Sequence, residues 1–155
     1  MEPVVIRPPA NPAELAAYYH LRWERLRRLW DLPPGSERDE LEDVAFHLVA
    51  VVGKSIVGTG RLHGVDAANA QVRCMAVHPE FERRGIARAI LLALEAEAHN
   101  RGVTRIQLNA RESAVGFYEK MGYADIGKGP FMYRVRHRLM EKCWPRANQA
   151  QKSSS

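Results

Sequence analysis

A glycine turn surrounded by arginines is the stretch of this sequence best suited to chemistry. The turn spans Arg83–Arg88 and joins an apolar strand pattern to a long amphipathic pattern. The first N–H groups of a helix lack intrahelical acceptors and lie at the positive end of the helix dipole, so they bind phosphate oxygens. Gly85 and Ala87 let the backbone approach such a ligand closely, and the arginine forks match phosphate geometry. The stretch predicts a diphosphate site.

Two common nucleotide motifs do not occur in the sequence, namely G-x-x-x-x-G-K-[ST] and G-x-G-x-x-G. Triphosphate and dinucleotide interpretations therefore lose most of their support. The simpler alternative for the turn is that Gly85 caps a helix and the neighbouring arginines form a solvated surface.

The elements around the turn follow from hydrophobic periodicity and from turn residues. Asn11 and Pro12 predict a helix start, with a side-chain cap and a proline at the first position. That helix, over residues 12–30, is expected to bury one face and to expose a strongly basic one. The acidic run over residues 36–43 is either a loop or one short helix. The predicted strands are Val4–Ile6, Phe46–Val52, Ile56–Leu62, Val72–Val77, Arg105–Ala110, Tyr123–Gly127 and Phe131–Met140, and the other predicted helices are Ile86–Asn100 and Ser113–Lys120.

Length and composition favour one globular domain over residues 1–143, followed by a polar and disordered tail over residues 144–155. The chain has 155 residues, of which 46% are hydrophobic and 26% charged, and a net charge of +5. Its basic residues form no dense stripe, so a nucleic-acid partner is not expected. Without a membrane-spanning pattern, a signal peptide or metal-ligand cysteine spacing, we expect a reduced cytoplasmic protein with no membrane partner and no metal. A homodimer is left open.

Two motifs resemble those of the GNAT acyltransferases. Val77–Ala87 is similar to the family pattern V-x-P-x-[YF]-[RQ]-x-x-G-x-[GA], and Ala114–Tyr123 to the pattern A-x-x-[FL]-Y-x-x-x-G-[FY]. The resemblance covers roughly Val44 to Met140. It implies an α/β fold with a mixed, mostly antiparallel sheet that contains a splayed parallel strand pair and is flanked by helices. It also implies an acetyl-CoA-dependent N-acetyltransferase.

The resemblance assigns roles to individual residues. The Met75–Val77 backbone would hold the pantetheine and thioester, and Tyr118 would donate a proton to the departing thiolate. The predicted cofactor-binding residues are Met75, Ala76, Val77, Arg83, Arg84, Gly85, Ile86, Ala87, Arg88, Asn109, Arg111, Phe117 and Tyr118. Cys74 is not expected to act as a nucleophile, because strand alternation points its side chain away from Arg73 and Met75.

The acceptor side is less specified by the sequence. An acceptor ammonium must lose a proton before attack, and the candidate bases are Glu37, Asp39, Glu42, His47, His63, Glu112 and His137. Glu112 and His63 join Tyr118 as the predicted catalytic residues. Glu37, Asp39, Arg61 and Arg73 are the predicted substrate-binding residues, with an ion-pair network among the arginines and the acidic run as the structural alternative.

The function expected from these observations is acetyl transfer from acetyl-CoA to a primary amine of a small or amino-acid-like acceptor, by direct attack in a ternary complex. The alternatives are a non-catalytic acyl-CoA-binding regulatory protein and a protein or peptide N-acetyltransferase.

Overall fold

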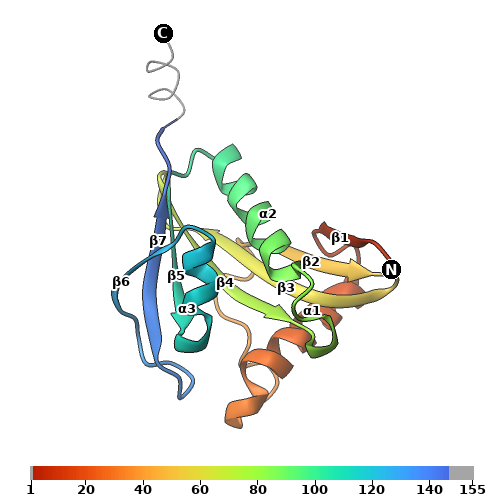
Figure 1. The fold of residues 1–155 in the computed structure, drawn as a ribbon. Helices are drawn as coiled ribbons and strands as arrows, with labels where there is room; N and C mark the ends of the chain where they lie inside the picture. The colour runs from red at the N-terminus through yellow and green to blue at the C-terminus, as the bar shows by residue number, and fades with distance from the viewer. Residues whose placement is uncertain (1, 147–155) are drawn as a thin grey trace. The chain divides into compact units, whose positions relative to one another are not determined.

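The computed structural model describes residues 2–146, which form seven strands, three α-helices and three short 3-10 helices (Figure 1). The strands are β1 (Val4–Arg7), β2 (Phe46–Val52), β3 (Ser55–Gly64), β4 (Asn69–Val77), β5 (Arg105–Arg111), β6 (Ala124–Lys128) and β7 (His137–Cys143). The helices are α1 (Pro12–Leu26), η1 (Arg28–Trp30), η2 (Pro79–Phe81), α2 (Ile86–Asn100), η3 (Glu112–Ala114) and α3 (Val115–Lys120). None of the helices in this range combines the length and the apolar character that a bilayer crossing needs. Most of the tail predicted for residues 144–155 lies outside the described residues.

The chain divides into two compact units. The first comprises the chain up to His63 together with Val72–Leu94, and the second comprises Gly64–Gln71 together with the chain from Glu95 onward. Hydrogen-bonded strands follow the order β1-β2-β3-β4-β5-β7-β6. Strand β4 therefore gives its first three residues to the second unit and the rest to the first.

The sheet is mixed, as the sequence predicted. Strand β4 pairs with β5 in parallel, and this pairing covers only Asn69 to Gln71 opposite Arg105 to Gln107. The pairs β1 with β2, β2 with β3, β5 with β7 and β6 with β7 are antiparallel. On its other side β5 pairs with β7 from Arg105 to Arg111, which is its whole length. The parallel pairing is therefore short because of β4 and not because β5 is short. The α/β fold class with one parallel strand pair is confirmed.

Two glycines of β3 allow α2 to pack closely on the first unit. A Cβ at Gly58 would lie 2.9 Å from side-chain atoms of Ile86 and Ile90, and one at Gly60 would lie 2.5 Å from Ile90. The apolar face of α2 is correspondingly buried, with Ile90, Leu91 and Leu94 all at 0% exposure. The predicted bounds of this helix are confirmed.

Helix α1 is shorter than the sequence predicted, and two basic residues of the predicted span are less exposed than expected. Asn11 caps it as expected, since its side chain accepts a hydrogen bond from the Glu14 N–H at 2.8 Å. The helix ends at Leu26 because Arg27 leaves helical geometry, and a 3-10 turn covers the rest of the predicted span. The expectation that Arg22 and Arg27 belong to the strongly basic exposed face was wrong, because both are buried.

The second unit holds a buried polar contact beneath its own strands. The Tyr123 hydroxyl donates to the Glu95 carboxylate at 2.7 Å, and the Lys142 ammonium lies 3.3 Å from the same carboxylate. The strand predicted over Phe131–Met140 begins only at His137. Tyr133 and Arg134 both have positive φ angles and form a turn in the segment before it, which local apolar patterning does not reveal.

Candidate functional site

The basic turn has the local geometry that the sequence predicted. Helix α2 begins at Ile86, so the N–H groups of its first turn have no intrahelical acceptor. Arg83 and Gly85 both adopt left-handed backbone angles, with φ of 63° and 77°. A Cβ at Gly85 would meet no atom within 4 Å, and Arg83, Arg84 and Arg88 are exposed. The turn is therefore an open, positively charged helix start.

Strand β4 contains a backbone irregularity at Cys74, whose φ angle is 61°. The Thr59 hydroxyl fixes this irregularity by donating to the Cys74 carbonyl at 2.8 Å. Met75 faces α2, because its sulfur would lie 3.0 Å from a Cβ on Gly60, whereas Arg73 contacts Asp39. The predicted alternation was wrong here, since the left-handed residue rotates the strand.

Cys74 consequently lies near the buried arginines of the first unit. Its thiol interacts electrostatically with Arg22, Arg61 and Tyr18. The expected separation of Cys74 from both flanking side chains does not hold, because Arg73 and Met75 lie on opposite faces of the strand.

Five charged side chains of the first unit form one network, which we call the ionic cluster: Arg22, Asp39, Glu42, Arg61 and Arg73. Arg22 binds both carboxylate oxygens of Glu42, at 2.8 and 2.9 Å. Arg61 binds both oxygens of Asp39 at 2.9 Å and also Glu42 at 2.9 Å. Arg73 reaches Asp39 at 3.4 Å. The ion pairs that the sequence offered as one alternative are present.

The carboxyl groups of the ionic cluster are held in their charged form. Burial raises the pKa of Asp39, but hydrogen bonds from Arg61 and the Leu41 N–H outweigh it and bring the pKa to about 2. Burial likewise raises the pKa of Glu42, but the hydrogen bonds from Arg22 and the Asp39 N–H, together with the positive charges of Arg22 and Arg61, lower it below its usual value. Neither group is suited to take a proton at neutral pH.

A tyrosine and a histidine continue the network. The Tyr18 hydroxyl lies 2.7 Å from Nδ1 of His47, and Nε2 of His47 lies 2.8 Å from the Glu42 carbonyl oxygen. Because a carbonyl can only accept, Nε2 carries the proton and Nδ1 accepts from Tyr18. Burial lowers the pKa of His47, which favours this neutral form.

The residues predicted to bind the acceptor differ in how exposed their side chains are. Arg61 is fully buried and is held by Asp39 and Glu42, so it cannot contact a solute. Glu37 is also buried, and its carboxylate accepts from the Gly35 N–H at 3.1 Å. His63 lies beside Arg61, with Nδ1 at 3.4 Å from Nη2, as their shared strand face predicted. Asp39 and Arg73 keep partly exposed side chains.

Tyr118 lies in α3 of the second unit and is buried. Its ring packs edge-on against Phe117 at 5.0 Å and Tyr123 at 5.9 Å between centroids. Burial raises the pKa of Tyr118, and Arg111 of the same unit opposes this increase only in part. The phenol therefore keeps its proton at neutral pH.

The other predicted residues of the second unit occupy β5 and the short helix after it. Asn109 pairs with Leu139 of β7, and its side-chain oxygen would lie 3.2 Å from a Cβ on Gly129. Glu112 begins η3 and is exposed. Its carboxylate interacts electrostatically with Arg138 of β7.

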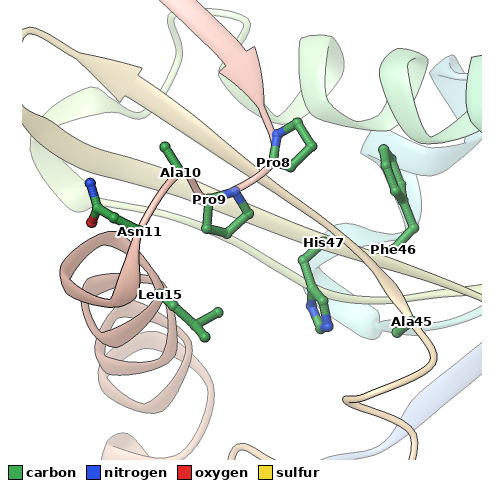
Figure 2. A pocket seen from close by; sticks show the side chains of 8 residues that line it. All are labelled: Pro8, Pro9, Ala10, Asn11, Leu15, Ala45, Phe46 and His47. Atoms are coloured by element: carbon green, nitrogen blue, oxygen red, sulfur yellow. The ribbon is translucent and has the colours of Figure 1, made fainter.

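A cavity of about 450 Å³ lies elsewhere in the first unit (Figure 2). Leu15 of α1, the connection Pro8–Asn11 and the segment Ala45–His47 line it. The lining is largely apolar, and His47 already binds Tyr18 and Glu42. This cavity contains none of the predicted site residues except the candidate base His47.

Sequence reasoning placed Glu42 in a possible ion-pair network but missed Arg22, which binds both of its carboxylate oxygens. Arg22 was grouped with an exposed basic face, although it stands four residues after Tyr18 and shares its helix face. That spacing on an otherwise apolar face was the available signal. Within residues 2–146, no three side chains of His, Cys, Asp or Glu gather as a metal site.

A family model and several solved structures match this chain. The model of the Acetyltransferase (GNAT) family matches residues 15–123. The chain belongs to this family. It is thus an acyl-CoA-dependent acetyltransferase, as the sequence resemblance predicted.

Solved structures share the fold. A Lactobacillus plantarum protein described as an N-acetyltransferase is 24% identical, with 90% of this chain and 97% of that chain covered and a TM-score of 0.78. An aminoglycoside 6'-N-acetyltransferase in complex with coenzyme A is 19% identical, with coverages of 93% and 98% and a TM-score of 0.71. The ribosomal-protein-S18-alanine N-acetyltransferase of Escherichia coli is 21% identical, with coverages of 91% and 94% and a TM-score of 0.70.

Proposed function

We propose that this GNAT protein transfers an acetyl group from acetyl-CoA to the primary amine of a small, amino-acid-like acceptor. The observation that carries the donor half is the helix start at Ile86 behind the open, left-handed turn at Gly85. Unpaired backbone N–H groups, the helix dipole and three exposed arginines suit a diphosphate. Coenzyme A is the ligand of the aminoglycoside acetyltransferase that shares this fold.

The residues proposed to hold the donor follow from the family motifs. The backbone of Met75–Val77 would hold the thioester arm, and Arg83–Arg88 would hold the diphosphate. From the second unit we propose Asn109, Arg111 and Phe117 as further residues that contact coenzyme A. The open space around Gly85 fits a phosphate group approaching the backbone.

The proposed chemistry is direct attack of the amine on the thioester. The amine nitrogen forms a bond to the carbonyl carbon, the bond from carbon to sulfur breaks, and the thiolate takes a proton from Tyr118. A buried phenol suits this role because burial keeps it protonated at neutral pH. The acceptor ammonium loses one proton to a base before attack, for which Glu112 and His63 remain our candidates. The second proton, which the nitrogen loses as the amide forms, restores the Tyr118 phenol.

The ionic cluster supports a change in the proposed acceptor residues. We retain Asp39 and Arg73, whose side chains are partly exposed. Arg61 becomes a positioning residue that holds Asp39, because burial removes it from contact with a substrate. Glu37 is assigned to the structure of the segment before Asp39.

The test is release of coenzyme A from acetyl-CoA in the presence of a panel of primary amines and amino acids. Tyr118→Phe should lower kcat by about 10²- to 10⁴-fold and leave acetyl-CoA affinity unchanged. Tyr123→Phe is the matched control, since it removes the hydroxyl of the adjacent ring and with it the Glu95 hydrogen bond. We expect that variant to lose stability but to keep its turnover.

Tight coenzyme A binding without turnover of any amine would instead support a non-catalytic regulatory protein. Acetylation of peptide or protein N-termini alone would reject the small-molecule acceptor. The compared enzymes are named for an aminoglycoside and for a ribosomal protein, so this fold is found with both kinds of acceptor.

A further inference from the structure

The ionic cluster has one more guanidinium group than it has carboxylates. Arg22, Arg61 and Arg73 contribute three positive charges, and Asp39 and Glu42 contribute two negative ones. Among the described residues, Glu37 makes no ion pair with any of these arginines. His47 is neutral in its hydrogen-bonded form. The cluster by itself therefore carries an unbalanced positive charge.

Two of the three arginines have no capacity for a further ligand. Arg22 and Arg61 are both at 0% exposure. The terminal nitrogens of Arg22 bind Glu42 and the Glu37 carbonyl oxygen, and those of Arg61 bind Asp39 and Glu42. The Nε atoms of both are buried and have no hydrogen-bond partner among the described residues, and burial keeps a ligand from reaching them. The contacts of the terminal nitrogens balance the two carboxylates. The unbalanced charge therefore resides on Arg73.

Arg73 differs from both in exposure and in bonding. Its side chain is 23% exposed, and within residues 2–146 its polar contact is a long 3.4 Å approach to Asp39. A guanidinium group has five N–H donors in a planar fork. Most donors of Arg73 thus have no acceptor among the residues that the structure describes. Asp39 orients the side chain while leaving its fork open to a second anion.

The left-handed backbone of Cys74 in β4 determines where this fork lies. Because Cys74 is left-handed, Arg73 projects to the side of the ionic cluster, while Met75 turns to the α2 side. Arg73 therefore stands directly before the Met75–Val77 backbone, which we propose to hold the thioester. An acceptor that attacks this thioester would have its non-reacting part near Arg73.

We infer that Arg73 binds a carboxylate of the acceptor, so that the substrate is a primary amine that carries a carboxylate, such as a free amino acid. This inference rests on the proposed function. Arginine binds carboxylates through two parallel hydrogen bonds, which gives both orientation and selectivity. Asp39 repels a misplaced carboxylate and attracts one terminal nitrogen of the guanidinium group through the 3.4 Å contact. Arg73 is then a specificity residue, and the buried arginines support it.

The experiment compares each of several L-amino acids with its own carboxamide, for example L-phenylalanine with L-phenylalaninamide. The two compounds share the amine and side chain and differ in the anionic charge. The wild-type protein should favour the acid in kcat/KM. Arg73→Gln should lower kcat/KM for the acid by about 10- to 100-fold, chiefly through KM, since it removes a charged hydrogen-bond pair. Turnover of the amide should change by less than about threefold.

Two further variants separate binding from stability. Arg73→Lys keeps the charge but loses the fork, so it should recover part of the loss. Arg101→Gln removes an exposed arginine at the end of α2 that pairs with Glu97 at 3.0 Å, and it should leave both acceptors unaffected. Acetyl-CoA affinity, measured by calorimetry, should be equal in all four proteins.

Several results would overturn the inference. Equal wild-type turnover of acids and amides would do so and would leave the transferase function in place. An equal loss for both acceptors in Arg73→Gln, or a weaker acetyl-CoA affinity, would assign Arg73 to the donor or to the fold. Donor binding without turnover of any carboxylated amine would also reject it. Absence of coenzyme A binding in the wild type would reject the proposed function itself.

Discussion

Arg61 holds Asp39 through two parallel hydrogen bonds, each 2.9 Å long, between its terminal nitrogens and the two carboxylate oxygens. The pair joins β3 to a segment without regular secondary structure. Glu42 accepts from the same arginine and from Arg22 of α1, so three parts of the first unit meet on two carboxylates. The ionic cluster thereby orders the segment that carries Asp39.

Glu42→Gln should destabilise the protein strongly. Removing one charge leaves two buried guanidinium groups without their shared partner, which costs about 3 kcal/mol in the free energy of unfolding. Urea unfolding followed by circular dichroism measures the loss. The control is Glu97→Gln, which breaks an exposed helix pair and should cost about 0.5 kcal/mol. Similar values for both variants would show that the buried cluster contributes little.

Stability should fall in two separate pH ranges on acidification. Burial lowers the pKa of His47 in the folded protein, so the unfolded chain takes up the proton first. The contribution of neutral His47 to the free energy of unfolding is complete above the pKa of about 6.5 that histidine has in the unfolded chain. It is lost as the pH falls below that value. The Asp39 pKa is about 2 when folded, and its contribution is present above about pH 4 and lost between about pH 4 and about pH 2.

Variants assign each pH range to its residue. The free energy of unfolding, measured by urea at a series of pH values, should lose its upper slope in His47→Gln and part of its lower slope in Asp39→Asn. Asp39 contributes roughly 2 kcal/mol by this linkage. An upper slope that persists in His47→Gln would mean that another group titrates there.

Gly60→Ala should destabilise the first unit by packing alone. A Cβ would lie 2.5 Å from Ile90 and 3.0 Å from Leu94 and Met75, so α2 would have to move away from β3. We expect a loss of about 2 kcal/mol in thermal or urea unfolding. Gly64→Ala in the same strand is the control, because its Cβ would meet nothing within 4 Å. A neutral result for Gly60→Ala would show that the helix can shift without cost.

Gly85→Ala should weaken coenzyme A binding more than it weakens the fold. Its positive φ angle strains any side chain by about 1 kcal/mol, and the methyl group would occupy the open space before the helix start. Gly102→Ala is a matched control, with φ of 80° and an equally open surrounding at the other end of α2. Calorimetric titration with coenzyme A should show reduced affinity only for Gly85→Ala. Equal affinities would remove the turn from the donor site.

Local patterns in the sequence were sufficient to predict the secondary structure around the expected donor site. The start of α2 at Ile86, the turn at Gly85 and the cap at Asn11 depend on residues within a few positions of each other. Hydrogen bonding and backbone freedom at such short range follow directly from residue type. The two family motifs are likewise contiguous stretches, and they indicated the fold class before any long-range contact was known.

The ionic cluster was decided only by tertiary structure. Arg22 and Glu42 are 20 residues apart, Arg61 and Glu42 are 19 apart, and Arg73 and Asp39 are 34 apart. Apart from the position of Arg22 on the Tyr18 face of its helix, no local pattern distinguishes these buried charges from exposed ones, because burial depends on which distant element supplies the counter-charge. The left-handed Cys74 also escaped the sequence, since its conformation is fixed by Thr59 in the neighbouring strand. Motifs therefore determined where the acetyl donor is expected, and packing between distant strands decided that Arg73 is the arginine left open.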